Sequence, residues 1–182
     1  MMVKICGITN LEDALAAVDA GATALGFNFY PASPRFIQPQ AAATIIERLP
    51  AGVLLVGVFV NESPEEVASA AGLAGVDVVQ IHGERGAPPG FRYWQAARMA
   101  PDFDFASLSR YAAEAFLLDA FAQGAWGGTG TTWDWTLAAG VPHRIILAGG
   151  LDAGNVSRAI QEARPWGVDA CSRLEASPGR KD

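Results

Sequence analysis

The sequence has few of the residues that build metal centres or disulfide frameworks. It holds two cysteines and two histidines among 182 residues, and their spacing matches neither a set of metal ligands nor a disulfide framework. Clusters of basic residues are also missing, and the formal net charge of −6 argues against a nucleic-acid partner. An anionic small ligand remains compatible with this charge, because local donors can override net charge.

Long apolar runs are missing as well. The longest ones, such as residues 53–60, are far too short to span a bilayer, and the sequence opens with no secretory segment. Reduced thiols are typical of the cytoplasm. We therefore expect a cytoplasmic protein without a membrane partner. With 51% hydrophobic residues, the chain predicts one domain, residues 1–182, around a sizeable core.

Short apolar runs alternate with amphipathic stretches, which predicts parallel strands joined by helices. The run at residues 53–60 does not alternate with polar residues, so both of its faces are expected to be buried. Eight such strands favour a (βα)8 TIM barrel, and a doubly wound open sheet is the alternative. The strands are expected at residues 3–8, 24–30, 53–60, 76–82, 92–98, 115–120, 144–148 and 167–172.

The helical patterns differ in strength. Asn10 and Ser63 are expected to cap helices, and further helices are expected at residues 39–49 and 152–163. Weaker patterns cover residues 84–91, 102–113 and 134–140, the first of which could hold only a turn. Residues 175–182 follow the last strand, so the barrel is expected to lack its final helix. An apolar groove, exposed or filled by a partner chain, would then flank the first and last strands.

Two residues are candidates for proton transfer. Cys6 ends the first expected strand and shares a face with Lys4, whose charge would favour a thiolate that can act as a base. Alternatively, Cys6 is a small buried hydrophobic residue. Asp134 follows a Gly/Thr-rich segment and is flanked by two tryptophans. Partial burial by these tryptophans could raise the pKa of Asp134 and so allow it to act as an acid. Alternatively, Asp134 caps a helix.

Further candidates follow other expected strands, where the chemistry of such barrels collects. Arg35 could clamp a carboxylate or lie on the surface. Gly149 and Gly150 could let backbone N–H groups approach a phosphate or form a tight turn. His82, which shares a face with Gln80, could orient a substrate or be a structural residue. Asp169 is expected to pair with Lys4 across the barrel closure.

Several of these motifs together resemble a known family. In order along the chain, residues 4–9, 26–35, 79–83, 127–130, 133–135, 147–151, 155–156 and 167–169 are similar to those of phosphoribosylanthranilate isomerases of tryptophan biosynthesis. The resemblance implies a cofactor-free, metal-free barrel with a small phosphorylated substrate, present as a monomer or a homodimer.

The resemblance also implies roles for individual residues. Cys6 would be the general base and Asp134 the general acid of an Amadori rearrangement, which converts N-(5-phosphoribosyl)anthranilate into 1-(2-carboxyphenylamino)-1-deoxyribulose 5-phosphate. Arg35 would bind the anthranilate carboxylate. The phosphate would be held by the turn at Gly149–Gly150 and by the loop around Ser172. Residues 127–131 would form a lid.

The chain departs from the family where it reads Cys171-Ser172-Arg173 rather than Ser-Ser-Gly. Arg173 would then contact the phosphate or crowd its site, and we expect phosphate binding to be weakened but retained. Two alternatives follow: a phosphosugar-binding barrel with a weakened site, and the related aminoaldose isomerase of histidine biosynthesis. The second typically has an aspartate where this chain has Cys6.

Overall fold

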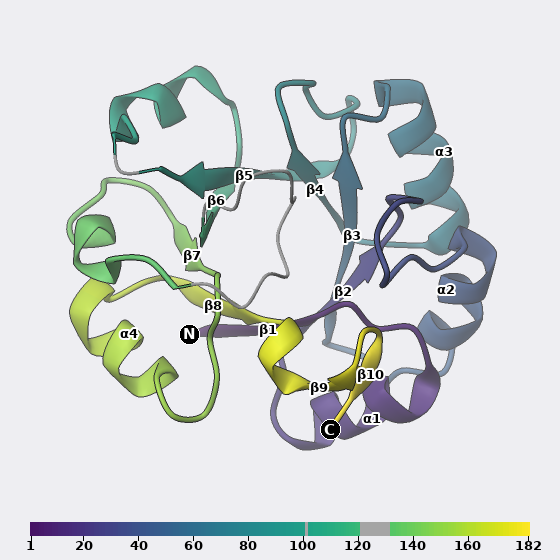
Figure 1. The fold of residues 1–182 in the computed structure, drawn as a ribbon. Coiled ribbons are helices and arrows are strands. Elements are labelled where there is room, and N and C mark those ends of the chain that lie inside the picture. The colour runs from purple at the N-terminus through teal and green to yellow at the C-terminus, as the bar shows by residue number, and fades with distance from the viewer. Residues whose placement is uncertain (101, 121–131) are drawn as a thin grey trace.

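The computed structural model describes residues 1–100, 102–120 and 132–182, and in them eight parallel strands close into a barrel (Figure 1). The expected lid at residues 127–131 therefore lies outside the described residues. The barrel, rather than the doubly wound open sheet, is confirmed. The strands are β1 (Met2–Cys6), β2 (Ala24–Asn28), β3 (Leu54–Val60), β4 (Val78–His82), β5 (Arg92–Met99), β6 (Ala115–Ala120), β7 (Ile145–Leu147) and β8 (Gly167–Ala170).

Each strand pairs with the next one along the chain, and β8 closes the barrel by pairing with β1. In that closing pair, Lys4 lies opposite Asp169 and Ile5 lies opposite Ala170. In β3 the last five residues are all buried, because one face lines the barrel and the other packs against helices. This agrees with the absence of polar alternation in its sequence.

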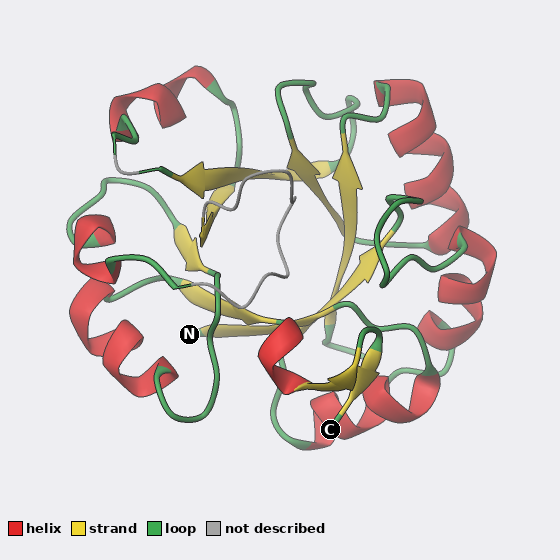
Figure 2. Cartoon of the chain, in the orientation of Figure 1, coloured by secondary structure: helices red, strands yellow, loops and turns green. Residues whose placement is uncertain are grey.

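Helices cover the outside of the barrel (Figure 2). Asn10 caps α1 (Leu11–Asp19) by accepting from the Asp13 N–H. A capping box of Ser63 and Glu66 starts α3 (Pro64–Ala74), as the Ser-Pro-Glu-Glu sequence indicates. The remaining α-helices of the described residues are α2 (Pro39–Ile46) and α4 (Val156–Ala163).

The weaker helical patterns become short elements. Two are single 3₁₀ segments, η1 (Phe105–Arg110) and η2 (Trp135–Ala138), while residues 84–91 form only bends and turns. No helix in the described part of the chain is long and apolar enough to cross a membrane.

The apolar core has layers inside and outside the barrel. Val56, Val78, Trp94 and Leu117 belong to a cluster that fills the barrel, and each is almost fully buried. Two further clusters lie between the strands and the helices, one beside α1 to α3 and one beside α4. The packed interior closes one end of the barrel, which leaves the carboxyl ends of the strands to form a site.

A short hairpin follows β8 in place of a helix. It consists of η3 (Ser172–Leu174), β9 (Glu175–Ser177) and β10 (Arg180–Lys181), and Figure 1 places it beside α1. The Lys181 N–H donates to Asp13 at 2.8 Å, and the Thr9 hydroxyl donates to the Gly179 carbonyl. On the outer face of β1, Val3 and Ile5 are half-buried. The expected apolar groove, exposed or filled by a partner, stays a prediction.

Candidate active site

A cavity of about 310 Å³ opens at the carboxyl ends of the strands. This size fits one small substrate. The cavity is lined from several directions around the barrel, by Cys6 of β1, His82 of β4, Asp119 of β6 and Asp169 of β8. The loops after β2, β7 and β8 complete the wall with Arg35, Gly149, Gly150, Ser172 and Arg173.

Cys6 lies at the mouth above a buried ion pair. Lys4 Nζ lies 3.0 Å from Asp169 Oδ1, which confirms the pairing expected across the barrel closure, and Lys4 is completely buried. The pKa of the Cys6 thiol is lowered because it accepts a hydrogen bond from Cys171, and because the Lys4 ammonium lies beside it, against the opposing effect of burial. A side chain at residue 26 is excluded, since a Cβ there would lie 2.7 Å from Cys6 Sγ. The Cys6 thiol therefore lies where the hydrogen bond from Cys171 and the charge of Lys4 favour its thiolate form.

Asp119 supplies a carboxyl group at the same cavity. It lies near the end of β6, where it is almost completely buried and its Oδ1 accepts from the Ala120 N–H at 2.8 Å. Burial is the main reason that its pKa rises to about 6, and the nearby Cys6 adds to the rise. Gly149 makes room for this carboxyl group, because a Cβ there would lie 3.1 Å from Asp119 Oδ1. Asp119 can thus hold a proton at a pH where an exposed aspartate cannot.

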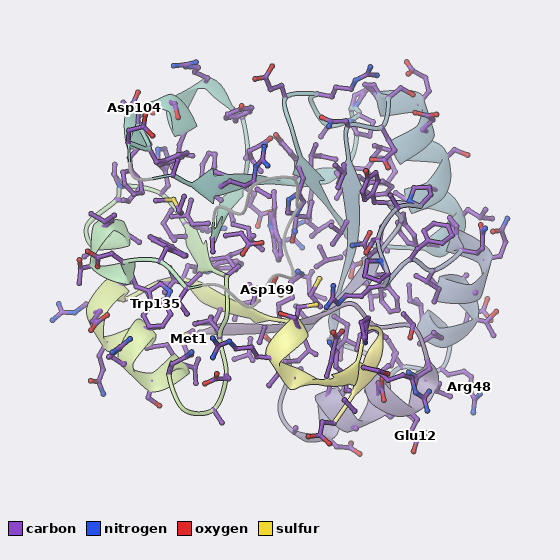
Figure 3. All side chains as sticks on the ribbon, viewed as in Figure 1. Met1, Glu12, Arg48, Asp104, Trp135 and Asp169 are labelled. Carbon is purple, nitrogen blue, oxygen red and sulfur yellow. The ribbon has the colours of Figure 1, made fainter. Side chains whose placement is uncertain are left out.

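Asp134 does not line this cavity. It is exposed at the start of η2, where it accepts from the N–H of Thr136 at 3.1 Å and from its hydroxyl at 2.6 Å. The flanking Trp133 and Trp135 turn to other partners: Trp133 donates to the Ala148 carbonyl, and Trp135 packs beside α4. Figure 3 shows Trp135 outside the barrel and Asp169 among the strands. The structure therefore contradicts the expected placement of Asp134 opposite Cys6, because its carboxylate caps a 3₁₀ segment.

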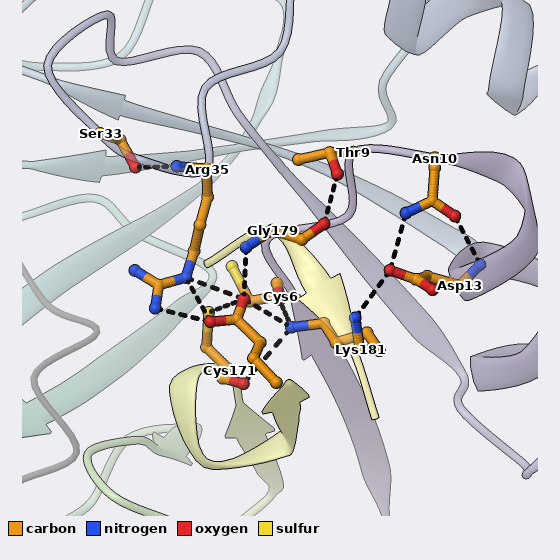
Figure 4. Close-up of polar contacts among 10 residues, drawn as sticks. Cys6, Thr9, Asn10, Asp13, Ser33, Arg35, Cys171, Gly179 and Lys181 are labelled. Atoms are coloured by element: carbon orange, nitrogen blue, oxygen red, sulfur yellow. Dashed lines mark hydrogen bonds and ion pairs between the residues drawn. The ribbon is translucent and has the colours of Figure 1, made fainter. Parts of the chain in front are cut away.

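Arg35 reaches the cavity from the loop after β2, held by an acidic partner. Its Nε and Nη2 bind both carboxylate oxygens of Glu175 at 2.7–3.1 Å (Figure 4). Lys181 Nζ lies 3.2 Å from the same carboxylate. Although burial would raise the pKa of Glu175, these two cations lower it. The hairpin after β8 thus fixes the direction of the Arg35 guanidinium.

The loops after β7 and β8 form a second wall of the cavity. Gly149 and Gly150 have φ angles of +89° and +61°, which favour glycine. Across from them, Arg173 Nη1 lies 2.6 Å from Asp152 Oδ2, and Ser172 lines the cavity beside it. Glycine amides, a hydroxyl and a guanidinium are donors that suit a phosphate.

His82 faces the cavity from β4 as a neutral ring. Burial, together with the charges of Lys4 and Arg98, lowers its pKa to about 3. Its Nε2 lies 2.9 Å from the side-chain nitrogen of Gln80, which confirms that the two side chains share a face. A neutral imidazole at this position can accept or donate a hydrogen bond without carrying charge.

The comparisons with known proteins agree on one family. The family model described as N-(5'phosphoribosyl)anthranilate (PRA) isomerase matches residues 3–182. The chain is 55% identical over 185 aligned residues to the N-(5'-phosphoribosyl)anthranilate isomerase of Solibacter usitatus, an alignment that covers 100% of this chain and 92% of that protein.

Solved structures give the same result. The phosphoribosyl anthranilate isomerase of Thermotoga maritima matches with a TM-score of 0.90 and 40% identity, covering 100% of this chain and 93% of that one. A phosphoribosyl anthranilate isomerase in complex with reduced 1-(o-carboxyphenylamino)-1-deoxyribulose 5-phosphate matches with a TM-score of 0.85 and 40% identity, over 100% and 92% of the two chains. This chain therefore belongs to the phosphoribosylanthranilate isomerase family, which serves tryptophan biosynthesis.

Proposed function

We propose that this chain catalyses the Amadori rearrangement of N-(5'-phosphoribosyl)anthranilate, with Cys6 as the general base and Asp119 as the general acid. The observation that carries the proposal is that an activated thiol and a protonatable carboxyl group, from β1 and β6, line one cavity of suitable size. The reaction needs one proton delivered to the ring oxygen and one proton removed from C2. No change in oxidation state of the whole molecule occurs.

Asp119 serves the first step. As the bond between the anomeric carbon and the ring oxygen breaks, its carboxyl proton passes to that oxygen, and the aniline nitrogen forms a protonated imine. A carboxyl group with a pKa of about 6 stays protonated up to a higher pH than one with the ordinary pKa of 3.8. General acid catalysis of this kind contributes about 10²–10⁴-fold in rate.

Cys6 serves the second step. The protonated imine acidifies the neighbouring C2–H bond, and the Cys6 thiolate removes that proton. The electrons of the C–H bond form the C1–C2 double bond of an enolamine, which tautomerises to the ketone of the product. The Lys4 ammonium beneath Cys6 stabilises the thiolate, and Asp169 compensates the buried charge of Lys4.

Two groups would hold the anionic ends of the substrate. The Arg35 guanidinium offers Nη1 to the anthranilate carboxylate, while Glu175 keeps Nε and Nη2 in place. The phosphate would bind at Gly149 and Gly150, with Ser172 and Arg173 on the facing loop. Arg173 adds positive charge there, and His82 orients the substrate as a neutral hydrogen-bonding group.

The test is turnover by the purified chain, followed by the loss of anthranilate-type fluorescence. We expect activity in the wild type and its near-complete loss in Cys6→Ala. A chain that only binds phosphosugars would be stabilised by the ligand without forming product, and an aminoaldose isomerase of histidine biosynthesis would turn over its own substrate instead. Either result would overturn the proposal. The assembly, as a monomer or a homodimer, and the cytoplasmic location stay predictions.

A further inference from the structure

A second thiol faces the catalytic one across the barrel closure. β1 pairs with β8 so that Lys4 lies opposite Asp169 and Ile5 opposite Ala170. Continuing this register by one residue places Cys6 opposite Cys171. Because side chains alternate along a strand, Cys6 and Cys171 point to the same side as the Lys4–Asp169 pair, one layer nearer the mouth.

Several contacts show that the two thiols are neighbours. Cys171 and Cys6 hydrogen bond to each other through their side chains. A Cβ at Gly7, the residue after Cys6, would lie 3.1 Å from Cys171 Sγ. Lys181 Nζ binds the carbonyl oxygens of both cysteines, at 2.6 Å from Cys6 and 3.3 Å from Cys171 (Figure 4). One ammonium group thus ties the two backbones together.

This spacing suits a disulfide. Neighbouring strands lie about 4.7–4.9 Å apart, and disulfides join Cα atoms that are about 4.4–6.8 Å apart. Both cysteines are free and both line the open cavity, so a small solute that enters the cavity can reach them.

We propose that Cys6 and Cys171 form a reversible disulfide when the enzyme meets a peroxide, and that this modification switches off catalysis. The Cys6 thiolate attacks one peroxide oxygen, the O–O bond breaks, and the leaving hydroxide takes up a proton to become water. Cys6 is then a sulfenic acid. The Cys171 sulfur attacks it, the S–O bond breaks, and a second water leaves with the Cys171 proton. Two thiols and one hydrogen peroxide thus give one disulfide and two waters.

The pair has the chemistry for both steps. The thiol nearer Lys4 is the better nucleophile, because its anion is stabilised, and the other is placed to resolve the sulfenic acid. The hydrogen bond to the Cys6 thiolate and burial raise the pKa of Cys171, which keeps it protonated during the first step. Oxidation of Cys6 removes that thiolate, and the charges of Lys181 and Arg35 then favour loss of the Cys171 proton in the second step. A dithiol such as dithiothreitol would return two electrons and two protons and restore both thiols.

The experiment treats the purified full chain with hydrogen peroxide and follows the intact mass and the activity. We expect the mass to fall by two hydrogens, a Cys6–Cys171 peptide to appear after digestion without reductant, and activity to return with dithiothreitol. Cys171→Ser is the matched variant. Its activity after peroxide treatment is compared only with the activity of the same variant before treatment. In that variant Cys6 should gain oxygen atoms. Prolonged treatment should then cause a loss of activity that dithiothreitol does not reverse.

Two outcomes would overturn the proposal. One is that Cys6 of the wild type gains oxygens with no loss of two hydrogens. The other is that Cys171→Ser recovers as completely as the wild type after the same treatment. The switching of activity rests on the proposed role of Cys6, but the mass measurement does not. A disulfide without any change in activity would refute the role of Cys6 as base and the switch, and would leave the modification site established.

Discussion

Replacing Asp119 with asparagine should slow the reaction and, at neutral pH, stabilise the fold. Asparagine has nearly the same shape, and its Oδ1 can still accept from the Ala120 N–H, which lies 2.8 Å away in the wild type. It cannot release a proton to the ring oxygen. We expect kcat to fall by roughly 10²–10⁴-fold, the usual contribution of a positioned acid.

The effect on stability follows from the raised pKa of Asp119. Folding raises that pKa from 3.8 to about 6. The carboxyl group therefore contributes its full stabilisation below pH 3.8, and loses it as the pH rises through about 6. One pKa unit corresponds to about 1.4 kcal/mol, so the free energy of unfolding of the wild type falls by on the order of 3 kcal/mol by pH 8. The amide of Asp119→Asn has no such titration, so the variant should gain stability relative to the wild type between pH 4 and pH 8.

The assay combines fluorescence kinetics with urea unfolding of both proteins at pH 4 and pH 8. Asp134→Asn is the matched control, since it makes the same chemical change at an exposed capping position. It should keep both kcat and nearly all of its stability, because asparagine and aspartate cap helical turns about equally well. The reasoning is refuted if Asp134→Asn loses as much activity as Asp119→Asn. It is also refuted if the stability difference between Asp119→Asn and the wild type does not change with pH.

Three further predictions concern the ion pairs around the site. Arg173→Gly should raise KM about tenfold, because a charge-assisted hydrogen bond contributes about 1.5 kcal/mol; an unchanged KM would remove Arg173 from phosphate binding. Lys4→Met should lower the free energy of unfolding by about 3–5 kcal/mol, since it leaves Asp169 buried without its partner; urea unfolding checks this, and wild-type stability would contradict it. Glu175→Gln should raise KM severalfold and retain most of kcat, because it loosens Arg35; a fall in kcat at unchanged KM would show that Glu175 does not act by holding Arg35.

The fold was predictable because its signals are local. Each apolar run became a strand, and the caps at Asn10 and Ser63 start helices as expected. The pairing of Lys4 with Asp169 was also predictable, since a barrel must bring its first and last strands together. The 3₁₀ segments are shorter than the patterns that predicted them, because tertiary contacts rather than periodicity decide the length of such segments.

Asp119, the acid that we propose, was not identified from the sequence, because Asp134 stands in a more noticeable sequence context. Asp134 stands in a conspicuous Gly/Thr- and Trp-rich context, yet its side chain does what aspartate commonly does before a helical turn. Asp119 follows the run Ala115–Leu118 and looked like the end of a core strand. A carboxyl group at the carboxyl end of a barrel strand was the signal that could have identified it.

Contacts between residues far apart in the sequence could not be predicted from the sequence alone. The Arg35–Glu175 pair joins residues 140 apart, and Lys181 reaches Cys6 over a separation of 175 residues. Neither pairing has a local pattern, because each depends on where a loop and a hairpin meet in space. The cavity itself could be located at the strand ends, but the partners that orient its side chains could not.

The closing strand pair has a consequence for how this enzyme matures. Lys4 and Asp169 lie 165 residues apart in the sequence, so the ion pair beneath Cys6 cannot form until residue 169 has been synthesised. Contacts between such distant residues form slowly during folding. The nucleophilic sulfur should therefore gain its reactivity late, after the rest of the cylinder has assembled. Nascent chains would be protected from premature thiol chemistry because the ribosome synthesises β1 long before β8.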